Sequence, residues 1–131
     1  MDEQVRAVLM EPGKAPQVVI LPQLVDWLQT LRWTRELGPR LSFTEVIRYG
    51  RRVHIHFVDV AASPKRPANV LVPHGTRLFD DPAAELEIVG GPVLVTQGRP
   101  DAVGQLEVHS LSDEDLSWVL ETFALGGRHR I

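Results

Sequence analysis

The sequence contains no cysteine and few aromatic residues, which make up 6% of its 131 residues. Without cysteine the chain forms no disulfide bond and offers no thiolate to a metal, which suits a reducing cytoplasm. No apolar run approaches the roughly 18 to 20 residues that span a bilayer, and the start Met-Asp-Glu is acidic where a secretion signal is basic. We therefore expect a soluble, cytoplasmic protein with no membrane attachment.

Signatures of common catalytic chemistry are also missing. None of the serines lies in a Gly-x-Ser-x-Gly elbow, the turn that presents a nucleophile in many hydrolases. Gly13-Lys14 lacks the earlier glycine and the following Ser or Thr that a phosphate-binding loop requires. We expect a binding protein rather than an enzyme, with no catalytic residues and no cofactor.

Length and composition are those of an ordinary globular protein. Hydrophobic residues make up 44% of the chain and charged residues 24%. A chain of this length buries enough surface to fold around one core without a covalent staple. We therefore predict a single domain over residues 1–131.

Positive charge is concentrated in the middle of the sequence. Residues 48–77 hold six basic residues and one acidic residue, whereas residues 78–131 hold three basic and ten acidic ones. Such a basic segment repels itself unless an anionic ligand or an acidic surface relieves it. Alternatively, acidic residues of the last third screen this positive charge within the fold. Examples are Asp80, Asp81, Glu85 and Glu87.

The hydrophobic pattern predicts a hairpin inside this basic segment. Residues 43–49 and 52–60 form two strands around Gly50, which suits the first position of a two-residue type II′ loop completed by Arg51. That register places Tyr49 opposite Arg52. One face of the hairpin then presents a polar row: Glu45, Tyr49, Arg52, His54 and His56.

Four further segments predict strands. Residues 5–10 and 17–21 flank a turn at Pro12-Gly13 and predict a hairpin. Residues 69–72 predict a short strand. Residues 85–96 predict a strand with a bulge or tight bend at Gly90-Gly91-Pro92, because proline and glycine weaken a central ladder.

Apolar residues at helical spacing predict two helices. The first begins at Pro22 and ends before Gly38-Pro39. The second follows Ser112, which is a favourable N-cap residue. Together these elements predict an α+β fold with a mixed, mainly antiparallel sheet of five or six strands and two packed helices.

The order of these elements resembles a small family of unknown function found in bacteriophages, plasmids and other bacterial mobile elements. The resemblance spans nearly the whole chain and includes the Glu11-Pro12-Gly13-Lys14 turn and the start of the last helix, Ser110 to Asp115. Members tend to carry a Gly-Gly after the first helix, where this chain has Leu37-Gly38-Pro39. The resemblance implies a phage or mobile-element accessory protein with a counter-defence role in the cytoplasm of a bacterial host.

The basic hairpin and the loop after it form the candidate binding site. Guanidinium groups form bidentate hydrogen bonds with phosphate oxygens, and tyrosine stacks on bases. We therefore predict that the ligand is a compact, nucleotide-like anion. The acidic remainder of the chain argues against long duplex nucleic acid, and a homodimer with sites at its boundary is compatible with such a ligand. The predicted ligand-binding residues are Arg48, Tyr49, Arg51, Arg52, His54, His56, Lys65, Arg66, His74 and Arg77.

Two alternatives remain open. His54 and His56 point the same way from one strand, and Glu45 or His74 would complete the donor set of a histidine-based metalloenzyme. The predicted site nevertheless includes no metal ligands. In the other alternative the chain is an inhibitor or adaptor that binds a basic host protein through its acidic last helix. The residues concerned are Asp113, Glu114, Asp115 and Glu121.

Overall fold

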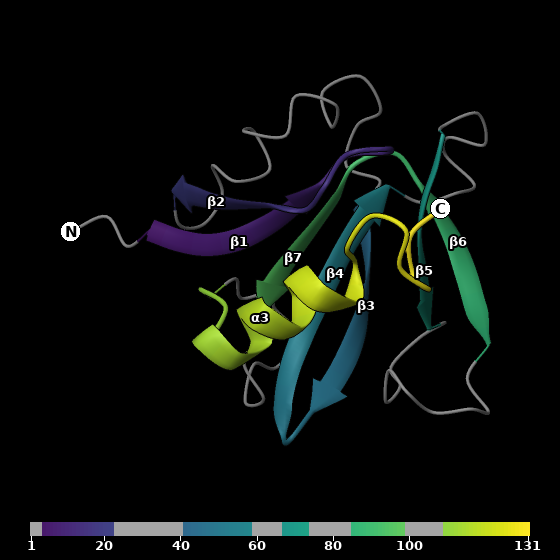
Figure 1. Ribbon diagram of the computed structural model, residues 1–131. Helices are drawn as coiled ribbons and strands as arrows, with labels where there is room; N and C mark the ends of the chain where they lie inside the picture. Colours follow the sequence, from purple (N-terminus) through teal and green to yellow (C-terminus); the bar gives the residue numbers. More distant parts are fainter. Residues whose placement is uncertain (1–3, 23–40, 59–66, 74–84, 99–108) are drawn as a thin grey trace.

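The computed structural model describes residues 4–22, 41–58, 67–73, 85–98 and 109–131. These form seven strands and one helix (Figure 1). The strands are β1 (Gln4–Met10), β2 (Gln17–Pro22), β3 (Leu41–Arg48), β4 (Arg51–Val58), β5 (Ala68–Pro73), β6 (Leu86–Gly90) and β7 (Val93–Gln97), and the helix is α3 (Asp113–Thr122). Five strands make one antiparallel sheet in the order β2-β1-β7-β4-β3, and β5 and β6 make a second.

The prediction of an α+β fold with two packed helices is wrong. Within the described ranges the molecule is mostly β, both sheets are wholly antiparallel, and α3 is the single helix. The helix predicted after Pro22 falls on residues 23–40, which lie outside the described residues. Pro22 itself ends β2 opposite Gln4. Proline suits that position because β2 lies at an edge of the described sheet, where a missing N–H leaves no gap in a ladder.

Two other predicted elements are confirmed. The hairpin expected over residues 5–10 and 17–21 is formed by β1 and β2, with Gly13 in its turn at a φ of 76°. The cap expected at Ser112 is also present, because its Oγ accepts the backbone N–H of Asp115 at 3.2 Å. In both cases local turn and cap chemistry was enough to predict the element.

The strand predicted over residues 85–96 is divided between the two sheets. β6 pairs with β5, whereas β7 lies in the large sheet between β1 and β4. Gly91 takes a φ of 75° and donates its N–H to the carbonyl of Pro67 at 2.8 Å. The predicted bend at Gly90-Gly91-Pro92 is therefore confirmed, and it carries the chain from one sheet to the other.

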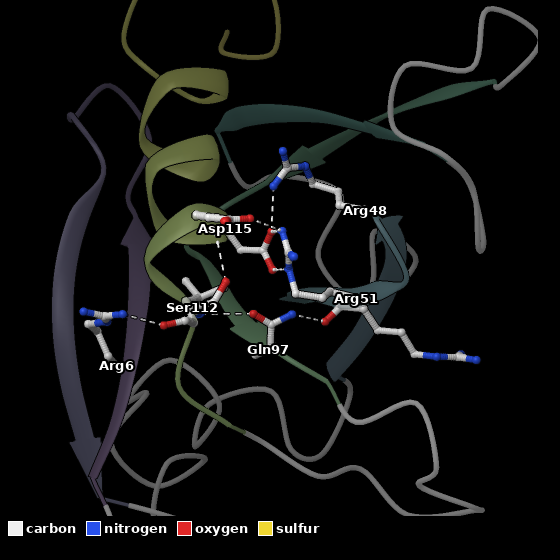
Figure 2. A network of polar contacts seen from close by, with 9 residues as sticks. Arg6, Arg48, Arg51, Gln97, Ser112 and Asp115 are labelled. Atoms are coloured by element: carbon white, nitrogen blue, oxygen red, sulfur yellow. Dashed lines mark hydrogen bonds and ion pairs between the residues drawn. The ribbon is translucent and has the colours of Figure 1, made fainter.

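The core lies between one face of the five-stranded sheet, the small sheet and α3. Alternate residues of β4 face it, as the two-residue repeat of a strand requires. Its buried members are Val8, Met10, Val46, Val53, Ile55, Phe57, Val70, Val72, Val89, Val93, Val95, Leu111, Val119 and Phe123. The first turn of α3 lies beside the end of the β3–β4 hairpin (Figure 2). No helix in the described part of the chain is long and apolar enough to cross a membrane.

Candidate functional site

The β3–β4 hairpin turns through Tyr49 and Gly50. The register pairs Arg48 with Arg51 and Ile47 with Arg52. Tyr49 and Gly50 have φ values of 49° and 76°, which are the positive signs of a type I′ turn. The predicted type II′ loop of Gly50 and Arg51 is therefore wrong by one residue. The prediction failed because it did not place a tyrosine in the left-handed region.

The corrected register puts the hairpin arginines on opposite faces. Arg48 and Arg51 share the face of Val53, which is directed toward the core and α3. Arg52 shares the other face with His54. Four members of the predicted polar row therefore share one side of the sheet: Glu45, Arg52, His54 and His56. The fifth, Tyr49, lies in the turn, and two of the three turn arginines stand on the other side.

Arg48 and Arg51 both bind the carboxylate of Asp115 in the first turn of α3 (Figure 2). Arg51 donates from Nε at 2.8 Å and from Nη2 at 3.0 Å, and Arg48 donates from Nη1 at 2.6 Å. Asp115 is fully buried. Burial raises the pKa of Asp115, but the hydrogen bonds and charge of Arg51, helped by Gln97 and Ser112, outweigh it and hold that pKa below its usual value. Asp115 is therefore an ionised carboxylate.

The other two acids of this turn pair at the surface. Glu114 accepts from Nη2 of Arg51 at 3.1 Å, and Asp113 accepts from Nη2 of Arg6 at 2.7 Å. Their side chains are 78% and 92% exposed. Exposed pairs of this kind contribute little to stability, so the buried carboxylate of Asp115 is the strong member of the cluster.

Gln97 at the end of β7 hydrogen-bonds both to the N-cap of α3 and to the start of β4. Its Oε1 accepts the backbone N–H of Ser112 at 3.2 Å, and its Nε2 donates to the carbonyl of Arg52 at 2.7 Å (Figure 2). The amide therefore ties the cap of α3 to the start of β4. This link holds Asp115 against the hairpin.

Acids of the last third pair with two of the hairpin arginines, but the described pairs do not involve Glu85 or Glu87. Asp80 and Asp81 lie outside the described residues. In the part of the chain that the structure covers, the carboxylates paired with Arg48, Arg51 and Arg52 belong to Asp115, Glu114 and Glu45. The basic hairpin and the acidic helix, predicted as two separate binding surfaces, are joined in one intramolecular network.

The opposite face of the hairpin carries a second polar cluster centred on Glu45. Its Oε1 accepts from Nη1 of Arg52 at 2.6 Å, and its Oε2 lies 2.9 Å from Nε2 of His54. His56 is buried with its Nε2 2.8 Å from Oγ1 of Thr96. Burial, and then the neighbouring His54, lowers the pKa of His56 to about 3. His56 is therefore neutral near pH 7, a state that does not attract an anion.

A metal site gains no support from these histidines. Among the residues that the structure describes, no three His, Asp or Glu side chains are grouped so that they could hold an ion. The rings of His54 and His56 lie 6.0 Å apart at 80°, and His54 is directed at Glu45. His74, the remaining candidate donor, lies outside the described residues.

Tyr49 is the exposed residue at the tip of the hairpin. Its side chain is 85% exposed. The guanidinium carbons of Arg48 and Arg51 lie 5.5 Å and 5.9 Å from the centre of its ring, within cation–π range. Arg48 also lies 4.4 Å from the ring centre of Trp118. Tyr49 is therefore an open aromatic ring flanked by two cations that Asp115 fixes in place.

Six of the ten predicted ligand-binding residues fall on the described hairpin: Arg48, Tyr49, Arg51, Arg52, His54 and His56. Three of them gather at the tip, namely Arg48, Tyr49 and Arg51. The other three lie along the Glu45 face. Lys65, Arg66, His74 and Arg77 lie outside the described residues.

The role of Asp115 was not predicted from the sequence, although the sequence carries a signal for it. Asp115 precedes Val119 by four residues and Phe123 by eight, which places all three on one stripe of the helix. Val119 and Phe123 are buried. A carboxylate on a buried stripe requires a cationic partner, and that requirement points to the basic hairpin.

Comparison of the chain with protein-family models, with curated proteins and with solved structures finds no match. The arrangement of residues at the hairpin tip is therefore the basis for a functional proposal.

Proposed function

We propose that this is a binding protein that recognises another protein through the tip of the β3–β4 hairpin, with Tyr49 as the anchoring residue. One observation carries the proposal. Tyr49 combines a left-handed backbone, at a φ of 49°, with a ring that is 85% exposed. Among the described residues, the ring makes only weak cation–π contacts with Arg48 and Arg51, which do little to offset the cost of that backbone conformation.

The left-handed conformation is unfavourable for a large side chain. It costs an L-residue roughly 1–2 kcal/mol, which is why glycine and asparagine dominate such turn positions. Burial could offset that cost, but the ring of Tyr49 is mostly in water. Strain at an exposed aromatic residue supports a role in contact with another molecule.

Shape and side-chain type favour a protein as that molecule. The β3–β4 turn lies at the end of the large sheet, beyond β7, and so forms a protruding tip (Figure 1). Tyrosine and arginine are enriched among the residues that dominate binding energy at protein interfaces. Asp115 already fixes Arg48 and Arg51, so these side chains lose little conformational entropy on binding.

A compact, nucleotide-like anion is a second candidate ligand. The side chains of Arg51 and Arg52 are 33% and 37% exposed, and the open ring of Tyr49 offers a face to a base. Asp115 holds Arg48 and Glu45 holds Arg52, so a free anion would have the single guanidinium group of Arg51 rather than the predicted cluster. The protein partner therefore ranks first. The phage or mobile-element setting and the counter-defence role implied by the resemblance remain part of the proposal, because a small host-binding protein suits them.

Photo-crosslinking from the hairpin tip tests this function. p-Benzoylphenylalanine replaces Tyr49 in one variant and Leu125, an exposed residue beyond the end of α3, in a control. In the cells that produce the protein, we expect a discrete protein adduct from position 49 that is absent from position 125. The adduct should also disappear when Arg51→Ala is added. Identical adducts from both positions, or none from position 49, would contradict the proposal.

A further inference from the structure

We infer that the partner presents a carboxylate two residues away from an aromatic ring in an extended segment, and that this carboxylate replaces Glu114 on Arg51. The inference rests on the proposed function of the hairpin tip and specifies the chemistry of its partner. It is carried by the charge balance around Asp115, the Nη1–Nη2 edge of the Arg51 guanidinium and the position of Tyr49.

The charge balance at the tip leaves one cation without a buried partner. Two guanidinium groups, those of Arg48 and Arg51, share the single buried carboxylate of Asp115. The second negative charge comes from Glu114 through one 3.1 Å contact to Arg51. The Glu114 side chain is 78% exposed, so this pair is weak and easily replaced. The tip therefore favours an incoming anion that holds Arg51 better than Glu114 does.

The geometry of the Arg51 guanidinium identifies a suitable anion. Asp115 occupies one edge of the group by accepting from Nε and Nη2. Glu114 touches Nη2, and within the described residues no hydrogen bond engages Nη1. Among the described residues, Glu114 alone therefore contacts the edge formed by Nη1 and Nη2, and a carboxylate that displaces Glu114 can accept from both nitrogens. Such a two-point pair is stronger than the single contact it replaces.

The position of Tyr49 sets the spacing in the partner. The guanidinium carbon of Arg51 lies 5.9 Å from the centre of the tyrosine ring. In an extended chain, side chains two residues apart point the same way at a spacing of about 6.6 Å. An aromatic side chain against Tyr49 thus places the acid two positions away onto Arg51. Stacking of the two rings adds to the contact.

A peptide pair tests this inference directly. The tripeptide acetyl-Phe-Ala-Glu-amide carries the proposed pattern, and acetyl-Phe-Ala-Gln-amide is its neutral match. Each is titrated into ¹⁵N-labelled protein while the Arg51 Nε–H and Tyr49 amide signals are followed. We expect the acidic peptide to shift both signals and the neutral one to bind more weakly. A third titration, with adenosine monophosphate, shows whether a phosphate group shifts the same two signals as the carboxylate of the acidic peptide.

Two charge variants show whether Glu114 is the group displaced. Glu114→Gln removes the competing carboxylate, and we expect it to tighten binding of the acidic peptide about two- to five-fold, the range set by a weak exposed ion pair. Glu121→Gln makes the same change about 10 Å further along the same helix, and we expect no effect.

The peptide titrations test the inference, whereas the crosslinking experiment tests the proposed function. Equal binding of the acidic and neutral peptides, or no response to Glu114→Gln, would overturn the inference. The inference would also be overturned if Glu114→Gln tightened the binding of adenosine monophosphate but not that of the acidic peptide. A discrete crosslink from position 49 would leave the proposed function standing in each of these cases, and its absence would overturn the proposed function.

Discussion

Asp115 and Arg51 form a two-point ion pair, with N–O distances of 2.8 Å and 3.0 Å, although 64 residues separate them in the sequence. The pair joins the first turn of α3 to the end of the β3–β4 hairpin. The basic middle of the chain and its acidic last third meet at this point. Within the described residues, two arginines of the basic segment are therefore paired with acids of the last third, and the exposed ring of Tyr49 lies beside them.

Asp115→Asn tests the contribution of this pair to stability. The substitution keeps the shape of the side chain but leaves Arg48 and Arg51 without their buried counter-charge. We expect a loss of about 2 kcal/mol in the free energy of unfolding, below the range for fully buried pairs because both arginines are partly hydrated. Asp113→Asn, two residues earlier in the same turn, removes the charge of an exposed pair; it is the control and should cost much less. Equal losses measured by urea denaturation would contradict the assignment.

The stability of the protein should fall on acidification because of His56. Its ordinary pKa of 6.5 is lowered to about 3 in the fold. Between these values the unfolded chain binds a proton and the folded chain does not. Each pH unit below 6.5 should therefore lower the free energy of unfolding by up to about 1.4 kcal/mol, until about pH 3. Urea denaturation at several pH values measures this slope.

A variant assigns that slope to His56. His56→Gln keeps a polar group near Thr96 but removes the titration. We expect the pH dependence between pH 6.5 and 4 to flatten, and an unchanged slope would refute the assignment.

Below pH 3.8 we expect a second loss of stability, from Asp115. The pKa of Asp115 is lowered in the fold, so its carboxylate stabilises the folded chain above pH 3.8, and this contribution to the free energy of unfolding is lost as the carboxylate becomes protonated.

Gly98→Ala tests the packing of the second polar cluster. A Cβ atom at position 98 would lie 2.5 Å from Cε1 and Nε2 of His54, which is buried and held by Glu45. We expect the substitution to lower stability by about 1–3 kcal/mol. The loss should be much smaller in a His54→Ala background, because the clashing ring is then absent. Losses of the same size in both backgrounds would show that the clash is not the cause.

The sequence predicted the strands better than their arrangement. Turn residues such as Gly13 and the bend at Gly90-Gly91-Pro92 mark local geometry, which neighbouring residues determine. The register of the β3–β4 hairpin is different. Val46 and Ile47 are both apolar, so alternation alone accepts either of two registers. The observed one depends on a tyrosine with positive φ, which residue preferences argue against.

The candidate site could be predicted only in part for a related reason. The cluster of arginines was visible as a run of charge, but the side of the hairpin that each occupies follows from the register. The partner of Arg48 and Arg51 lies on a distant helix, and Asp115 is the last of three consecutive acids, after Asp113 and Glu114. The helical stripe with Val119 distinguishes it, but the contact itself requires the fold.

The central claim of this account is that Tyr49 serves recognition and not the stability of the fold. Its most direct test is the free energy of unfolding of Tyr49→Asn, measured by urea denaturation. Asparagine suits the positive φ of the turn, while the exposed ring contributes only weak cation–π contacts. We expect a variant at least as stable as the original chain, with a gain of up to about 1 kcal/mol in the free energy of unfolding. A loss of more than about 1 kcal/mol would show that Tyr49 supports the fold, and would contradict the claim.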